Sequence, residues 1–173
     1  MKYGYVLAGG DPVANVELAV AAEAAGWDAV FCWEGVYHAD PWTQLTAIAM
    51  RTETIKLGTM LTPAPRRRPW VLASQCVTLD QLSGGRAILS VGVGAFDPVL
   101  GELPDEEHDI RARGELLDET IDLVRAMWSG KPVEYSGTHH TVKLPAGPKA
   151  VQKGRIPIWC VGIWPRMRSM RQS

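Results

Sequence analysis

Three consecutive arginines, Arg66, Arg67 and Arg68, are the residues whose types and spacing could most directly bind a ligand. They follow an apolar segment that is predicted to be a buried strand, and parallel α/β proteins bind ligands at the carboxyl ends of their strands. Guanidinium groups at such a place could bind an anion such as a phosphate or a carboxylate. A run of arginines can equally be a solvated loop that binds nothing, and the sequence leaves both interpretations open.

A glycine-rich segment, Gly92-Val93-Gly94, follows another apolar stretch. It carries two of the three glycines of the dinucleotide-binding fingerprint, but the third is missing and a long loop, instead of a helix, is predicted after it. The chain also has no phosphate-binding G-x-x-x-x-G-K-[ST] segment and no G-x-S-x-G nucleophile elbow. These patterns argue against a Rossmann nucleotide site.

The sequence predicts no metal site and no disulfide framework. His139 and His140 lie in a predicted hairpin without a carboxylate at helical spacing, so an exposed polar pair is the better interpretation. The three cysteines, Cys32, Cys76 and Cys160, are odd in number, far apart and surrounded by apolar residues. We therefore expect inert thiols, in a protein of the reducing cytoplasm.

Strand and helix patterns alternate along the chain and must position these residues. The predicted strands span residues 3–7, 29–33, 55–61, 87–93 and 157–161. The predicted helices span 12–25, 41–51 and 69–82, and a later one carries the apolar stripe of Leu117, Ile121, Val124 and Trp128. A small exposed hairpin is predicted as an insertion around 132–145.

Because the predicted strands are apolar throughout, they indicate a parallel sheet that is covered on both faces. Repeated strand–helix units of this kind form an open sheet or close into a barrel. We expect one core, made by residues in these strands: Leu7, Val30, Phe31, Leu57, Ile88, Leu89, Val91 and Ile158.

The composition limits the possible partners. The 173 residues suit a single domain, with 46% apolar and 21% charged residues, which is typical of a globular protein. Basic and acidic side chains nearly cancel, to a net charge of −1, so nothing attracts the chain to nucleic acid or to an anionic membrane. No apolar run approaches the length of a membrane helix, and the N-terminus is a poor secretory signal. We expect small-molecule partners, no nucleic acid and no membrane.

The order of short motifs along the chain is more specific than any single motif. The segments are 25–30 (AGWDAV), 40–42 (DPW), 57–63 (LGTMLTP), 66–70 (RRRPW), 78–86 (TLDQLSGGR), 91–94 (VGVG), 116–119 (LLDE) and 156–159 (IPIW). Together they resemble the bacterial luciferase-like family of flavin- and deazaflavin-dependent monooxygenases and reductases. The resemblance covers nearly the whole chain in order, and the segment from 79 to 86 is its most specific part.

The resemblance implies an α/β fold of the TIM-barrel type, a (β/α)8 barrel with the cofactor ring at the carboxyl ends of the strands. The implied cofactor is FMN, and a deazaflavin coenzyme is the alternative. The residues that would bind it are Met60, Leu61 and Thr62 after the third strand, and Gly92, Val93 and Gly94 after the fourth. The family often has a non-prolyl cis peptide under the ring, which here would be Met60-Leu61 or Leu61-Thr62.

The chain departs from the family in the residues that would do the chemistry. Many relatives have an acidic residue followed by histidine after the second strand, whereas this chain has Glu34-Gly35, with His38 three residues later. Glu34 and His38 are therefore the catalytic candidates. Trp33 and the three arginines at 66–68 are the candidates for contact with a substrate or an anion.

The second departure is length. A complete barrel needs about 200 residues or more, and this chain offers about five of the strands, so we expect an incomplete barrel. Because an open half-barrel exposes strand edges and an apolar face, we expect a homo-oligomer. The implied function is a flavin-dependent oxidoreductase or monooxygenase that acts on a small organic substrate. The alternative is a truncated, catalytically silent homologue that binds flavin or nothing and exists as a dimer.

Overall fold

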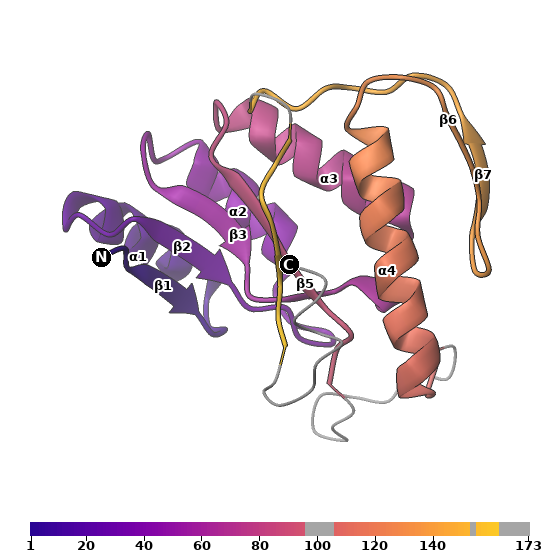
Figure 1. The fold of residues 1–173 in the computed structure, drawn as a ribbon. Coiled ribbons are helices and arrows are strands. Elements are labelled where there is room, and N and C mark those ends of the chain that lie inside the picture. Colours follow the sequence, from indigo (N-terminus) through magenta and orange to yellow (C-terminus); the bar gives the residue numbers. More distant parts are fainter. Residues whose placement is uncertain (96–105, 153–154, 163–173) are drawn as a thin grey trace.

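The computed structural model describes residues 1–95, 106–152 and 155–162, and it shows parallel strands alternating with helices (Figure 1). The elements are β1 (Gly4–Leu7), α1 (Pro12–Ala24), β2 (Ala29–Cys32), α2 (Pro41–Ala49), β3 (Lys56–Thr59), β4 (Thr62–Pro63), the 3-10 turn η1 (Ala64–Arg66), α3 (Pro69–Leu82), β5 (Ala87–Gly92), α4 (Ile110–Met127), β6 (Val133–Ser136), β7 (Thr141–Leu144) and β8 (Ile158–Cys160). The main sheet has the order β1-β2-β3-β5-β4, and β8 pairs with β5. All of these pairings are parallel, as the sequence predicts.

Aspartates fix the starts of three helices. The side chain of Asp11 accepts a hydrogen bond from the N–H of Val13, and Asp40 accepts one from Thr43. Asp109 caps α4 in the same way. Each cap satisfies an N–H group that the first helical turn leaves without a partner. Helix α3 is the exception, since its first flanking residue, Arg68, makes no capping bond.

The core lies mainly on one face of the sheet. A large cluster joins residues of α1, α2, α3 and α4 to side chains of the strands, including Val30, Leu57 and Leu89. Phe31 and Ile88 belong instead to a second, smaller cluster with Ala29, because alternate residues of a strand point to opposite faces. The expectation of one core was therefore wrong for these two side chains.

The second face of the sheet is less covered than the first. Val6 pairs in register with Phe31, and the Trp159 ring lies 5.4 Å from the Phe31 ring. Both Val6 and Trp159 are nevertheless exposed, at 42% and 45%. Helices cover one face among the described residues, so the expectation of a sheet covered on both faces was wrong here.

The third predicted strand is interrupted near its end. Regular pairing of β3 ends at Thr59. Shortly after it, the Met60-Leu61 peptide bond is cis. This is the first of the two positions that the resemblance implies. Beyond it the chain pairs again with β5, as β4, with Thr62 opposite Val91. The sequence did not separate β4 from β3, because the whole segment is uniformly apolar.

The predicted hairpin is present as β6 and β7, which pair antiparallel. The carboxylate of Glu119, on α4, accepts hydrogen bonds from the N–H groups of Thr138, His139 and His140 in the hairpin loop. Burial raises the pKa of Glu119, but these three bonds outweigh it and hold the pKa below its usual range. The two histidines are half-buried, so the expectation of an exposed polar pair was wrong.

All three cysteines are free, and Cys32 and Cys76 are buried. Burial, with Asp40 nearby, raises the pKa of Cys32 to about 12, which makes its thiol a poor nucleophile. Among the described residues no group of histidine, cysteine and carboxylate side chains is arranged to hold a metal ion. None of the described helices has the length and apolar character needed to cross a membrane.

Candidate functional site

The carboxyl ends of β2, β3 and β5 bring together a connected set of polar groups. Glu34 follows β2, and its Oε2 lies 2.8 Å from the hydroxyl oxygen of Thr62. That hydroxyl is 2.9 Å from the hydroxyl of Thr59, which donates to the carbonyl of Ser90. The Ser90 hydroxyl itself is buried and has no hydrogen-bond partner among the described residues. An unmet buried donor at this edge of the sheet is the kind of group that a ligand satisfies.

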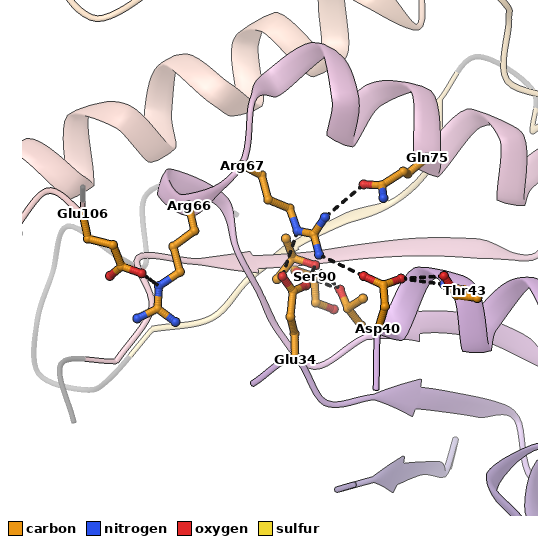
Figure 2. Close-up of polar contacts among 10 residues, drawn as sticks. Glu34, Asp40, Thr43, Arg66, Arg67, Gln75, Ser90 and Glu106 are labelled. Carbon is orange, nitrogen blue, oxygen red and sulfur yellow. Dashed lines mark hydrogen bonds and ion pairs between the residues drawn. The ribbon is translucent and has the colours of Figure 1, made fainter. Parts of the chain in front are cut away.

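Glu34 is the carboxylate at the centre of this set. Its Oε1 accepts a hydrogen bond of 2.8 Å from Nε of Arg67, which also contacts Gln75 and Asp40 (Figure 2). Burial raises the pKa of Glu34 above its usual range, while the Arg67 charge and the bonds from Arg67 and Thr62 act in the opposite direction. The pKa stays raised, because removal from water outweighs these bonds.

The three arginines have different surroundings. Arg66 pairs with Glu106 at 2.6 Å, and the same carboxylate pairs with the buried Arg113 (Figure 2). Arg67 is held by Glu34. Arg68 is exposed and lies over the Trp70 ring, 5.8 Å from its centre. Two of the three guanidinium groups are therefore already matched by carboxylates, and Arg68 is the one that is exposed at the surface.

The glycines after β5 lie against the cis segment. A Cβ at Gly92 would come within 3.1 and 3.2 Å of the Leu61 methyl carbons. A Cβ at Gly94, which has a φ of +83°, would come within 3.0 Å of Pro63. Met60 and Leu61 are themselves half-buried, so part of each side chain is open to contact. The two glycines thus let the cis segment pack closely on the end of β5, and the half-buried side chains of Met60 and Leu61 are the apolar surface that fits a flat, flavin-type ring.

Trp33 and His38 form a second cluster at the end of β2. Their rings meet edge to face, 5.2 Å apart. A Cβ at Gly35 would lie 2.5 Å from the His38 ring and 2.6 Å from the Trp33 ring. The space beside Gly35 is thus taken by the His38 imidazole, which comes from three residues further along the chain.

Sequence reasoning missed several residues of this site. Ser90 lies in an apolar strand, and only the missing partner of its hydroxyl distinguishes it. Gln75 and Asp40 reach Arg67 from helix α3 and from the start of α2, and no local pattern indicates this. Glu106 lies shortly before the start of α4, and no local pattern pairs it with Arg66. The cap motif at Asp40 was visible, but it indicated a helix start and not a contact with Arg67.

Comparison with known proteins decides the family. The sequence profile of the luciferase-like monooxygenases matches residues 3–171. The chain belongs to the luciferase-like monooxygenase family. The resemblance drawn from its motifs is confirmed, and so is the predicted fold class, an incomplete α/β barrel of the TIM-barrel type.

Relatives in this family are longer. An F420-dependent glucose-6-phosphate dehydrogenase of Nocardia farcinica is 32% identical over 157 residues, which are 83% of this chain and 46% of that protein. The F420-dependent tetrahydromethanopterin reductase of Methanopyrus kandleri matches with a TM-score of 0.79 at 26% identity, over 91% of this chain and 49% of that one. A monooxygenase of Streptomyces bottropensis matches with a TM-score of 0.73 at 28% identity, over 91% and 52%. The chain spans about half the length of the relatives it matches.

Proposed function

We propose that this chain forms the cofactor-binding part of an oxidoreductase that uses a flavin-type coenzyme on a small organic substrate. The observation that carries the proposal is the buried Glu34 carboxyl group, placed at the same sheet edge as Leu61 and the glycines at 92 and 94. F420 is the coenzyme named for the Nocardia and Methanopyrus relatives, and FMN is the alternative. When bound, such a coenzyme supplies the hydride or electrons of the reaction.

The proposed contacts with the cofactor ring follow from where these residues lie at the edge of the sheet. Met60, Leu61 and Thr62 would lie on one side of the ring, and Gly92, Val93 and Gly94 would let the ring approach β5. The unpartnered Ser90 hydroxyl is available for a hydrogen bond with the ring or the substrate. These contacts hold and orient the ring, and the buried side chains around them exclude water.

Glu34 is the first proposed acid and base of the reaction. The Thr62 hydroxyl lies within hydrogen-bond distance of both Glu34 and Thr59, and the Thr59 hydroxyl donates to the Ser90 carbonyl. The Thr62 hydroxyl has one proton, so it donates to one of these two oxygens at a time, and protonation of Glu34 would leave it free to donate to Thr59. The raised pKa of Glu34, caused first by burial, agrees with this arrangement. A neutral carboxyl group at this place can donate a proton to a substrate atom and take one back.

His38 is the second proposed catalytic residue. Many family members carry a histidine at the position of Gly35, and here the His38 ring occupies the space beside that glycine. The Trp33 ring packs against it and would restrict its orientation. Arg68, with its exposed guanidinium, is the proposed contact for an anionic group of the coenzyme or substrate.

The same geometry bears on the alternative, a catalytically silent homologue. The observation in its favour is Gly35, which removes the usual histidine. This alternative predicts that replacing His38 changes neither cofactor binding nor turnover. If the chain is an active enzyme, His38→Ala should lower turnover about 100-fold or more, which is the range typical of a lost general acid or base.

We also propose a homo-oligomer in the cytoplasm. Exposed apolar side chains on the open sheet face and on the helices support association. Three free cysteines support a reducing compartment.

The test is a parallel titration of the full chain with F420 and with FMN, each oxidised and reduced, followed by cofactor fluorescence. We expect saturable binding of one of them, weakened in Ser90→Ala. An absence of binding by both cofactors in both redox states would overturn the proposed function. Turnover with a cofactor and a series of small alcohols, aldehydes and ketones then separates an active enzyme from a silent one.

A further inference from the structure

Helices α3 and α4 and the base of the β6–β7 hairpin surround a cavity of about 210 Å³. Helix α3 contributes Trp70 and Val77 to its wall, and Met127 and Trp128 contribute from the last turn of α4 and its cap. Residues 145–148, which follow β7, complete the lining, and in Figure 1 this segment runs from the hairpin past the end of α4 toward α3. Three parts of the chain that are far apart in sequence thus form one small hollow.

The apolar part of this cavity includes two tryptophan rings that other contacts hold in place. Trp128 is only 4% exposed, and its indole N–H donates a hydrogen bond of 3.1 Å to the carbonyl of Ala73. The Trp70 ring lies beneath the Arg68 guanidinium and 6.4 Å from the His140 ring. An apolar cavity of about 150 Å³ is large enough to hold benzene. The hollow therefore has room for one aromatic ring with a short polar substituent.

The polar part of the cavity has donors but no anionic acceptor. Among the described residues that line it, Lys131 is the only charged one. The Lys131 ammonium makes no ion pair within the described ranges, and the N–H groups of Ala146 and Gly147 make no hydrogen bond there. The side chain of a second lysine, Lys149, lies against Gly130, next to Lys131 in the chain. Ammonium and backbone N–H groups of this kind are the donors that bind a carboxylate.

We propose that this cavity binds a small aromatic carboxylate. Its ring would pack against Trp70 and Trp128, since aromatic rings attract one another beyond the area that they bury. Its carboxylate would accept hydrogen bonds from Lys131 and from the N–H groups of Ala146 and Gly147. A neutral ring would leave Lys131 without an anion, and an amine would be repelled by it. The apolar wall and the single cation together select an aromatic monoanion.

The cavity is separate from the candidate site at the carboxyl ends of the strands. None of the residues proposed to contact the cofactor ring lines it. Trp70 connects the two places, because Arg68, the proposed contact for an anionic group of the coenzyme or substrate, lies over its ring. The inference does not rest on the proposed function, since binding of an aromatic carboxylate can be measured whether or not the chain binds a flavin-type coenzyme.

A titration of the full chain with phenylacetate, followed by proton–nitrogen NMR, tests the cavity. We expect saturable shifts of the Trp128 indole N–H and of the Ala146 and Gly147 amides, with a dissociation constant of about 1 mM or below. Phenylacetamide has nearly the same shape but no charge. It should bind at least about tenfold more weakly, because the hydrogen bond from the Lys131 ammonium would lose its anionic partner.

Variants of Lys131 identify the cation that binds the carboxylate. Lys131→Met keeps the apolar stem without the charge and should weaken phenylacetate binding at least about tenfold, whereas Lys131→Arg should retain most of it. Lys131 is exposed, so the folded chain tolerates both changes. Lys143→Met is the matched control, because Lys143 is an exposed lysine of β7 that pairs with Glu134 and does not line the cavity. Its affinity for phenylacetate should equal that of the wild type.

Several results would overturn the proposal. An absence of saturation up to about 10 mM phenylacetate would show that the cavity does not bind this class of ligand. Equal affinities for phenylacetate and phenylacetamide, or equal losses in Lys131→Met and Lys143→Met, would show that no carboxylate is recognised at Lys131. Shifts confined to the amides of Gly92 and Gly94 would place the ligand at the proposed cofactor site instead.

Discussion

The two ends of the parallel sheet hold their charged side chains in different ways. At the amino end, the buried Arg86 guanidinium uses all five of its N–H groups, on the Thr52 hydroxyl and on carbonyls of the surrounding loops. At the carboxyl end, Glu34 has a raised pKa and the Ser90 hydroxyl has no partner among the described residues. The buried charge at the amino end is thus fully hydrogen-bonded, whereas one buried hydroxyl is unmet at the carboxyl end, where parallel α/β proteins bind their ligands.

Two carboxyl groups, Glu23 and Glu34, differ between the two ends of the sheet in the same way. Glu23, at the amino end, accepts hydrogen bonds from the N–H groups of Glu53, Thr54 and Ile55. Burial raises its pKa, but the backbone bonds outweigh burial and hold the pKa below its usual range. Glu34 is more deeply enclosed and meets hydroxyl and guanidinium groups instead. The pKa of the carboxyl group that fixes a loop is thus lowered, whereas the pKa of the one at the candidate site is raised.

The largest expected effect is a loss of stability when Arg86, at the amino end of the sheet, is replaced. Arg86→Met should lower the free energy of unfolding by roughly 3 to 5 kcal/mol, because several buried carbonyl groups lose their donor and each costs about 1–3 kcal/mol. Urea denaturation followed by circular dichroism measures this. Lys56→Met, which removes an exposed cation from the same end, should cost less than about 1 kcal/mol. Equal losses in the two variants would contradict the structural role of Arg86.

The next effect is on cofactor affinity at the carboxyl end. Gly92→Val should weaken binding of F420 or FMN at least about tenfold, because the new side chain would crowd Leu61, where the ring is proposed to lie. Fluorescence titration gives the dissociation constants. Gly114→Ala is the control, since a Cβ there meets no atom within 4 Å. Unchanged affinity in Gly92→Val would remove β5 from the site.

A smaller effect concerns the pH dependence of stability through Glu34. Its pKa is higher in the folded chain than in the unfolded one, so the folded state binds the proton more tightly. The stability of the wild type relative to Glu34→Gln should therefore fall as the pH rises above about 4.3, the usual glutamate value, until the raised pKa is passed. Denaturation curves across this range measure the difference. A rise with pH would show that Arg67 dominates and that Glu34 is ionised.

The smallest expected effect is the pH dependence of stability through Glu119, which should have the opposite sign to that through Glu34. Glu119 has a lowered pKa in the folded chain, so its contribution is present above the usual glutamate range and is lost as the pH falls through the folded value. The difference in melting temperature between the wild type and Glu119→Gln should shrink on acidification. A difference that stays constant with pH would mean that the hairpin loop does not depend on the charge of Glu119.

The sequence was sufficient for the repeating framework of the fold. Helix α3 begins at Pro69 and ends at Leu82, as its proline and the following Ser83-Gly84-Gly85 predict. Continuous apolar runs predicted the parallel strands, although helices cover only one face of this sheet among the described residues. The small strand β4 was missed, since no change in composition separates it from β3.

The candidate site was only partly predictable. The family resemblance pointed to Glu34, Leu61 and Gly92, which the structure brings to one edge of the sheet. It could not show that Arg66 is paired with Glu106, because these residues are far apart in sequence and nothing local links them. The state of Glu34 likewise depends on burial and on neighbours from other elements, which spacing along the chain does not reveal.

The most direct test of this account is a carbon-13 NMR titration of the glutamate side chains in the full chain, with Glu34 assigned by the loss of its signal in Glu34→Gln. We predict that Glu34 titrates above the usual value of about 4.3, while Glu23 and Glu119 titrate below it. A Glu34 midpoint at or below those of Glu23 and Glu119 would contradict the claim that burial at the carboxyl end of the sheet raises the affinity of Glu34 for its proton.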